Sequence, residues 1–202
     1  MSEGQQGRAP ASPERDMLVE KKRRRAEPGC ANNVVMVDTR EQKNHVTDYL
    51  NKHGISNVRS KLIVGDYTLV NDQSLCIDRK HNLQEVCGNL CQQHERFRAE
   101  IMRAKDVGIR LVFLVEHGSG VMMLEDVQAW ENPRLKTSPY ALSGVGLYRR
   151  MLTIQNKYGV EWRFCDKRST GRIICEMLGV TVCGSTRRSS KAGSSCGRFV
   201  SG

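Results

Sequence analysis

The 202-residue sequence has no run of about 20 apolar residues, which is the length that a membrane-spanning helix needs. It also lacks an apolar signal segment ahead of its first cysteine, and no internal repeat is visible. These absences argue against a membrane-spanning or secreted protein. We therefore expect an intracellular protein with one domain and tails, cytoplasmic if its source is prokaryotic or a phage and nuclear if it is eukaryotic.

A disulfide framework is equally unexpected, although the chain holds 8 cysteines. Cys76, Cys165 and Cys175 lie in apolar runs, which is typical of small buried hydrophobic residues in an intracellular protein.

One cysteine group permits a second interpretation. Cys87, Cys91 and His94 have spacings that would place three metal ligands on one face of a helix, and would make the chain a zinc-stabilised interaction module. The alternative is an ordinary buried helix stripe, because apolar residues share that face: Leu83, Val86, Leu90, Phe97 and Ile101. No fourth ligand is evident nearby in the sequence.

The charge is strongly basic, with 32 Lys and Arg against 22 Asp and Glu and a net charge of +10. Such a balance favours an anionic partner, most commonly nucleic acid. More than half of the excess lies in residues 1–33 and 179–202, which we predict to be disordered tails because their composition is polar and lacks apolar periodicity. The tract KKRRR at 21–25 fits a nuclear address, a phosphate-binding arm or a solvated charge run.

Residues 34–178 alternate between strand-like and helix-like patterns, which predicts one α/β domain. The nearly all-apolar segment 109–116 predicts a central strand buried on both faces. We expect the three consecutive strands to form a meander, and the sheet to be mixed. The predicted strands are 34–39, 58–64, 67–70, 75–79, 109–116 and 160–165; the predicted helices are 44–54, 82–106, 138–157 and 169–178.

Acidic and basic residues collect at the ends of these strands. Asp66 follows Gly65 between two strands, and Asp78 and Lys80 share one face of the next strand because they are two residues apart. A hairpin here would bring the two carboxylates together beside the lysine, an arrangement that suits Mg²⁺ or Mn²⁺ and the hydrolysis of a phosphodiester. Two ordinary surface turns with a solvated lysine would give the same short pattern.

The sequence around these residues resembles that of the nuclease domain of the XPF/Mus81 family, also called the ERCC4 domain. The segments VDTREQ, GDY, IDRK and ERFRAE occur in the order and at the distances of that family, across about residues 34–178. The resemblance implies a restriction-endonuclease-like mixed β-sheet flanked by helices. It also implies a Mg²⁺- or Mn²⁺-dependent DNA endonuclease acting on flapped, forked or branched DNA in repair or recombination, and a homodimer.

The resemblance also implies roles for individual residues. Asp66 and Asp78, helped by Asp38, would be metal ligands, Lys80 the catalytic lysine and Glu41 an acidic helper of the cluster. The predicted DNA-binding residues are Arg40, Arg79 and Arg96, of which the first two are motif arginines and the third opens an Arg-Phe pair.

Two departures from the family pattern leave an alternative open. Asp78 stands where the family usually has Glu, and no tandem helix-hairpin-helix segment follows residue 178. The wider nuclease superfamily accepts Asp at this position, and the missing module is typical of a stand-alone nuclease domain of the phage or bacterial kind. A catalytically weak member that only binds DNA is the alternative.

Overall fold

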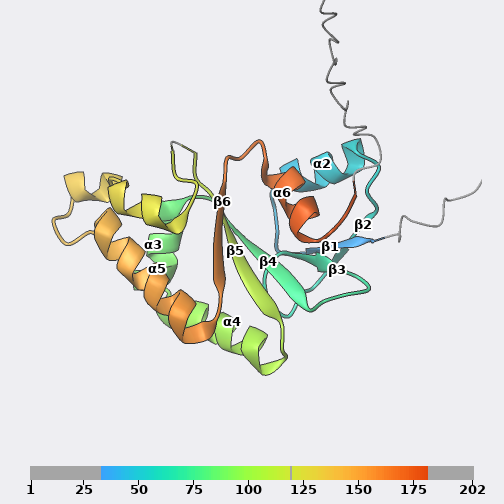
Figure 1. Ribbon diagram of the computed structural model, residues 1–202, viewed down its shortest axis with the longest axis horizontal. Coiled ribbons are helices and arrows are strands. Elements are labelled where there is room, and N and C mark those ends of the chain that lie inside the picture. The colour runs from blue at the N-terminus through green and yellow to red at the C-terminus, as the bar shows by residue number, and fades with distance from the viewer. Residues whose placement is uncertain (1–32, 119, 182–202) are drawn as a thin grey trace, which may run out of the picture. The chain divides into compact units, whose positions relative to one another are not determined.

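One mixed β-sheet of six strands organises the computed structural model, which describes residues 33–118 and 120–181 (Figure 1). The strands lie in the order β2-β1-β3-β4-β5-β6. β1 pairs in parallel with β2, β3 is antiparallel to both β1 and β4, and β4, β5 and β6 are parallel. The strands are β1 Val35–Asp38, β2 Asn57–Ser60, β3 Tyr67–Leu69, β4 Leu75–Lys80, β5 Arg110–Glu116 and β6 Glu161–Cys165.

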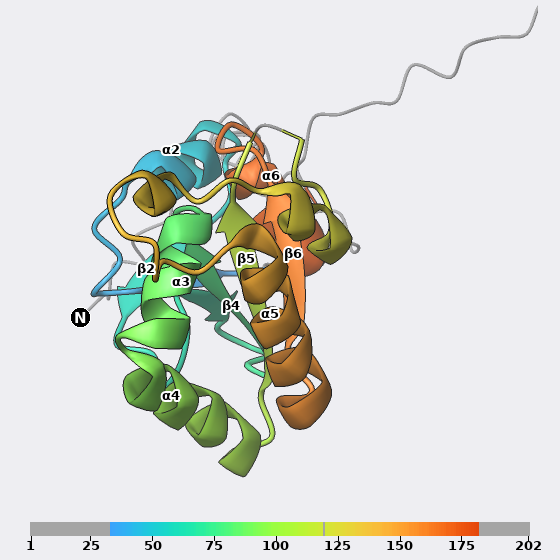
Figure 2. The same ribbon diagram turned by 90° about the vertical axis from the view of Figure 1, so that its left-hand side faces the viewer.

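Helices cover both faces of this sheet and give the domain three layers. One face carries α3 (Leu83–Cys91), α4 (His94–Asp106) and α5 (Gly144–Tyr158), which lie in front of the sheet in Figure 2. The other face carries α2 (His45–Lys52) and α6 (Thr170–Met177), which pack together in Figure 1. Two short 3-10 helices, η1 (Leu124–Ala129) and η2 (Pro133–Lys136), precede α5.

Strand β5 separates the two hydrophobic cores, as its apolar sequence predicts. Phe113 and Val115 pack into the core beneath α3, α4 and α5, whereas Leu114 packs into the core beneath α2 and α6. All three side chains are fully buried. The predicted α/β class and mixed sheet are confirmed, and the alternation along β5 and β4 decides which side chains reach which face.

The predicted three-strand meander is wrong. The segment predicted as strand 58–64 is the short edge strand β2, which pairs with β1 and not with β3. β1 lies between β2 and β3, so only β3 and β4 form a hairpin. Short connections between strands predict that strands adjacent in the sequence pair with each other. Parallel pairing instead joins strands that are distant in the chain, and no local sequence pattern indicates which strands these are.

Two helix predictions also need correction. The predicted helix 82–106 is broken into α3 and α4, because the N–H groups of Gln92 and Gln93 both donate to the Gly88 carbonyl and interrupt the helical ladder. The predicted start at Ser138-Pro139 is also wrong, since Ser143 caps α5 by accepting a hydrogen bond from Gly146 N–H at 3.2 Å.

The last structural elements agree with the sequence analysis. Helix α5 ends at Tyr158 and is capped by Gly159 in the left-handed conformation, and α6 follows Ser169. The predicted tails, residues 1–33 and 179–202, lie almost wholly outside the described residues and stay predictions. None of the helices in the described part of the chain has the length and hydrophobicity required to cross a membrane.

Candidate active site

The β3–β4 hairpin brings Asp66 beside Asp78. The backbone N–H of Asp66 donates to the Ile77 carbonyl at 2.8 Å, and the N–H of Arg79 donates to Asp66 Oδ2 at 2.9 Å. Asp66 is therefore hydrogen-bonded to the two residues of β4 that flank Asp78 in the chain. The predicted approach of the two carboxylates is present in the structure.

Gly65 allows this close approach. Its φ of +63° lies in the left-handed region, and a Cβ atom there would lie 2.7 Å from Cys76 Sγ and 3.1 Å from the Ile77 carbonyl oxygen. Its N–H donates to Glu100 Oε1 at 3.1 Å. The Gly65-Asp66 sequence is therefore explained by packing. Gly65 lets β4 approach closely, and the Asp66 side chain then contacts that strand.

Asp78 and Lys80 lie on the face of β4 that packs beneath α4. Lys80 Nζ is 2.8 Å from Asp78 Oδ2, and both side chains are nearly buried. The ammonium group also lies over two aromatic rings, 5.8 Å from the centre of Phe97 and 5.7 Å from that of Phe113. Within the described residues, this ion pair with Lys80 is the polar contact of Asp78 Oδ2, and no second donor reaches that oxygen.

Burial makes the charges of this cluster costly. Burial, and next the charge of Asp78, raise the pKa of Asp66 well above its usual value. Burial also raises the pKa of Asp78 to about 6, although Lys80 acts against this shift. Burial alone would lower the pKa of Lys80, but the neighbouring carboxylates, Asp78 first, raise it and keep the lysine charged. The site has more buried negative charge than Lys80 neutralises.

A third carboxylate, Glu100 of α4, completes the cluster. Glu100 and Lys80 line a polar hollow of about 240 Å³ with Glu85 and Arg96. The charge of Glu100 contributes to the raised pKa values of both Asp78 and Lys80. Glu100 belongs to the ERFRAE segment but is not among the predicted site residues; its spacing of four from Arg96, one helical turn, was the available signal.

Asp38 lies at the end of β1, and its carboxylate is fully engaged. Oδ1 accepts from the N–H and Nε of Arg40, both at 2.7 Å, and Oδ2 accepts from Leu62 N–H at 2.7 Å and from the Arg40 guanidinium at 3.0 Å. Burial opposes the charge, but these hydrogen bonds outweigh it and lower the pKa of Asp38. In this arrangement both Asp38 oxygens accept hydrogen bonds from Arg40 or Leu62, and the ligand role of Asp38 stays a prediction.

Glu41 and Arg79 belong to a separate network on the opposite face of β4. The buried Arg79 guanidinium forms ion pairs with Glu41 at 2.9 Å and with Glu116 at 3.0 Å. Glu116 also accepts from Thr170 Oγ1 at 2.7 Å and contacts His45 Nε2 at 2.8 Å. Arg79 and Glu41, predicted to bind DNA and to assist the acidic cluster, are internal here, and their placement supports a role in holding β4.

The residues at the Asp66–Asp78 cluster fit a hard divalent cation. Two adjacent buried carboxylates match the one or two carboxylates that Mg²⁺ takes from a protein while keeping several waters. In the described ranges, no group of three or more His, Cys, Asp or Glu side chains is arranged to hold a metal. Asp66 and Asp78 are the residues that would hold such an ion.

The zinc alternative finds no support in the described residues. Cys87 is buried, and its Sγ lies 4.0 Å from Asn132 Nδ2, whereas Cys91 Sγ contacts the Arg150 guanidinium at 3.4 Å. His94 lies on the next helix, because the predicted single helix is broken between Cys91 and His94. The shared helix face on which the zinc hypothesis depended does not exist.

Solved structures of known proteins share this fold. The chain is similar to XPF from Aeropyrum pernix, with 21% identity and a TM-score of 0.52, over 82% of this chain and 67% of that one. It is also similar to XPF from Aeropyrum pernix in complex with DNA, with 22% identity and a TM-score of 0.53, over 72% of this chain and 62% of that one. Among curated protein sequences, none matches.

The sequence profile of the ERCC4 domain matches residues 37–177, which include every strand-end residue described above. This range is more than half of the chain, and the fold agrees with the predicted restriction-endonuclease-like sheet. The chain therefore belongs to the ERCC4 domain family of XPF-type nuclease domains.

Proposed function

We propose that this protein is a DNA endonuclease that depends on Mg²⁺ or Mn²⁺ and hydrolyses phosphodiester bonds. The observation that carries the proposal is the cluster of Asp66, Asp78 and Lys80, in which two buried carboxylates share one charged lysine that lies 2.8 Å from Asp78 Oδ2. A buried pair of carboxylates destabilises the fold unless cations compensate it, and the single charge of Lys80 does not balance both, which supports metal binding here.

Each residue of the cluster has a task in the proposed reaction. Asp66 and Asp78 would hold the metal ion, which supplies an activated water and polarises the phosphate when bound. Lys80 stabilises the negative charge that develops on the phosphate as the attacking water forms a P–O bond and the bond to the leaving oxygen breaks. Ion pairing with Asp78 and contact with two rings hold the Lys80 ammonium in place.

Two exposed arginines extend from this cluster toward the solvent. Arg96 lines the polar hollow with Lys80, and Arg40 is 54% exposed while it remains paired with Asp38. Both are able to contact phosphates, and the DNA-bound XPF structure that this chain resembles supports DNA as the partner. We propose that the preferred substrates are flapped, forked or branched DNA of repair or recombination, and that the protein acts as a homodimer.

Cleavage of labelled DNA tests the proposal. Duplex, single-stranded, flap and fork substrates are incubated with Mg²⁺, with Mn²⁺ or with a chelator, using the wild type and Asp66→Ala. We expect metal-dependent cutting that Asp66→Ala abolishes. Asp72→Ala is the matched control, because Asp72 lies on the same hairpin but is fully exposed and distant from Lys80 in the fold.

The same assay distinguishes the alternative of a DNA-binding member without activity. DNA binding by the wild type without cutting in either metal would reject the nuclease and support that alternative. Asp78→Glu would then be the next variant, because it restores the side chain usual in the family. Equal cutting by Asp66→Ala and the wild type would reject the assigned site.

A further inference from the structure

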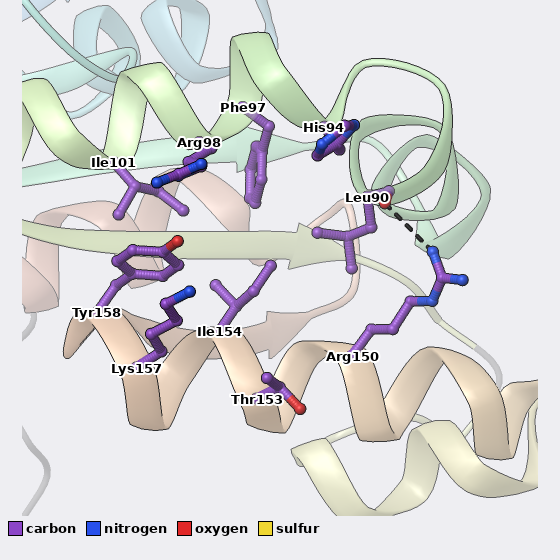
Figure 3. A pocket seen from close by; sticks show the side chains of 10 residues that line it. All are labelled: Leu90, His94, Phe97, Arg98, Ile101, Arg150, Thr153, Ile154, Lys157 and Tyr158. Atoms are coloured by element: carbon purple, nitrogen blue, oxygen red, sulfur yellow. Dashed lines mark hydrogen bonds between the residues drawn. The ribbon is translucent and has the colours of Figure 1, made fainter.

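A groove runs between α4 and α5, on the same face of the sheet as the candidate active site. Its volume is about 300 Å³, and it is open to solvent along one side (Figure 3). Figure 3 shows side chains from both helices pointing into it, with Leu90 of α3 closing one end. Neither the proposed reaction nor the packing of the core requires this groove.

The floor of the groove is apolar and partly aromatic. Its central side chains are Phe97 and Ile101 from α4 and Ile154 and Tyr158 from α5. Ile154 and Tyr158 are only partly buried, so part of each remains exposed to the groove. Phe97 and Ile101 are almost fully buried, so a bound ring would rest mainly on Ile154 and Tyr158, whose apolar surfaces cover a ring without leaving polar groups unpaired.

The rim of the groove is basic. Arg98 on α4 and Lys157 on α5 are exposed on opposite sides, and Arg150 closes one end, where its guanidinium donates to the Leu90 carbonyl at 3.4 Å. Lys157 Nζ also lies 5.3 Å from the centre of the Tyr158 ring. None of the ten residues that line the groove is acidic, so its charge complements an anion.

The groove adjoins the candidate active site at Phe97. This ring lines both the groove and the polar hollow that contains Lys80 and Glu100. Arg96 faces the hollow and Arg98 faces the groove, so the two neighbouring arginines of α4 lie along one path. An anionic polymer whose phosphate lies at Lys80 would meet the rim of the groove as its next basic contact.

We infer that the α4–α5 groove binds an unpaired nucleotide of the DNA strand that leaves the active site, with the base on the apolar floor and the phosphates on Arg98 and Lys157. The inference rests on the proposed nuclease function and specifies its substrate as DNA with a single-stranded segment. Paired bases are stacked inside a duplex, whereas an unpaired base offers a free face to aromatic and aliphatic side chains. An acidic protein segment would satisfy the basic rim but would leave the exposed apolar parts of Ile154 and Tyr158 uncovered.

Binding in chelator tests this inference without any dependence on cleavage. Fluorescence anisotropy measures the affinity for a short thymidine oligonucleotide, for the same oligonucleotide with abasic sites and for a duplex. The variant is Arg98→Ala with Lys157→Ala, and its matched control is Arg103→Ala with Arg149→Ala. The control removes the same charge from the exposed surface of the same two helices, at residues outside the groove.

We expect the groove variant to bind the thymidine strand about tenfold more weakly than the control variant, while both bind duplex equally. The abasic strand should bind the wild type about tenfold more weakly than the thymidine strand does. Equal losses in the two variants, or equal affinity for abasic and natural strands, would overturn the inference.

Two further outcomes separate this inference from the proposed function and from other occupants. Normal metal-dependent cutting with unchanged strand binding in the groove variant would overturn the groove alone and leave the nuclease intact. Sedimentation velocity measures the oligomeric state of the same samples. The other outcome is a dimer in the wild type and the control variant that is absent in the groove variant. That result would assign the groove to a second copy of this chain and overturn the inference as well.

Discussion

The backbone N–H of Arg79 donates a hydrogen bond of 2.9 Å to the carboxylate of Asp66, while the Arg79 side chain lies on the opposite face of the sheet. One residue thus joins the acidic cluster on one face to the Glu41–Glu116 network on the other. Side chains of the IDRK segment therefore alternate between the two faces of β4: Asp78 and Lys80 face the candidate site, and Arg79 forms ion pairs on the opposite face.

Asp66→Asn should stabilise the metal-free protein and abolish cutting. The asparagine oxygen keeps the hydrogen bond from Arg79 N–H, and the substitution removes a buried charge beside Asp78. We expect the free energy of unfolding in chelator at neutral pH to rise by about 1 kcal/mol, measured by urea titration.

This gain should depend on pH. Folding raises the pKa of Asp66, so the penalty in the wild type is complete above the raised value and shrinks as the pH falls from there toward the ordinary pKa of 3.8. The two proteins should therefore converge on acidification, and Asp72→Asn should show no such difference. A wild type as stable as Asp66→Asn at neutral pH would contradict the electrostatic description.

Lys80→Met should leave DNA binding nearly intact but lower the cutting rate. The methionine stem preserves the packing against Phe97 and Phe113, whereas the charge that stabilises the developing phosphate charge is lost. We expect a decrease of about 100-fold or more in single-turnover cleavage. Lys105→Met, on the exposed end of α4, should cut at the wild-type rate.

Glu116→Gln should destabilise the protein through the network behind β4. The side chain of Glu116 is buried and pairs with Arg79 and His45, so its replacement leaves part of the buried positive charge unpaired. We expect a loss of about 3 kcal/mol in the free energy of unfolding at neutral pH. Glu161→Gln, which removes the surface ion pairs with Arg110 and Arg163, should change this free energy by less than about 0.5 kcal/mol.

The same variant should be less sensitive to acid. Burial would raise the pKa of Glu116, but the hydrogen bond from Thr170 and the charge of Arg79 outweigh it and lower the pKa below 4.5. The stabilisation is complete above pH 4.5 and is lost as the pH falls through the lowered value. Urea titrations between about pH 5 and pH 3 should show a smaller decrease for Glu116→Gln than for the wild type.

Gly65→Ala should cost more than Gly54→Ala, although both glycines have positive φ values, +63° and +66°. The left-handed conformation costs each alanine about 1 to 2 kcal/mol. Only at position 65 would the new Cβ also meet β4, at 2.7 Å from Cys76 Sγ, whereas nothing lies within 4 Å at position 54. Thermal unfolding should rank the variants in this order, and only Gly65→Ala should also weaken cutting because Asp66 is displaced.

Purified protein should contain no stoichiometric zinc. Cys87 and Cys91 contact different partners, Asn132 and Arg150, and His94 begins another helix. Elemental analysis measures the metal content, and circular dichroism before and after chelation measures the effect on the fold. One zinc per chain, with unfolding on its removal, would restore the interaction-module hypothesis.

Several parts of the fold follow from local sequence. The apolar segment that forms β5 is long enough to require burial on both faces, and Gly159 ends α5 because a left-handed residue suits that position. The Gly-Asp and Asp-Arg-Lys segments likewise placed Asp66, Asp78 and Lys80 on one hairpin, since alternation along a strand fixes which side chains share a face.

Other parts depend on contacts between distant segments. The insertion of β1 between β2 and β3, the break between α3 and α4, and the approach of Glu100 to Gly65 have no local pattern that specifies them. The partners of Asp38, Glu41 and Arg79 are likewise not specified by a local pattern, because a charged side chain pairs with whichever oppositely polarised group the folded chain brings close to it.

The sequence by itself therefore determined the class of the domain and the identity of its chemical groups, because strand alternation, glycine turns and short motifs act over a few residues. Only the tertiary structure decided which of those groups meet. Asp66, Asp78, Lys80 and Glu100 share one buried site, whereas Glu41, Arg79 and Glu116 share another on the reverse of the same strand. Burial and charge, which set the pKa values and the energy of each site, exist only after distant segments have packed together.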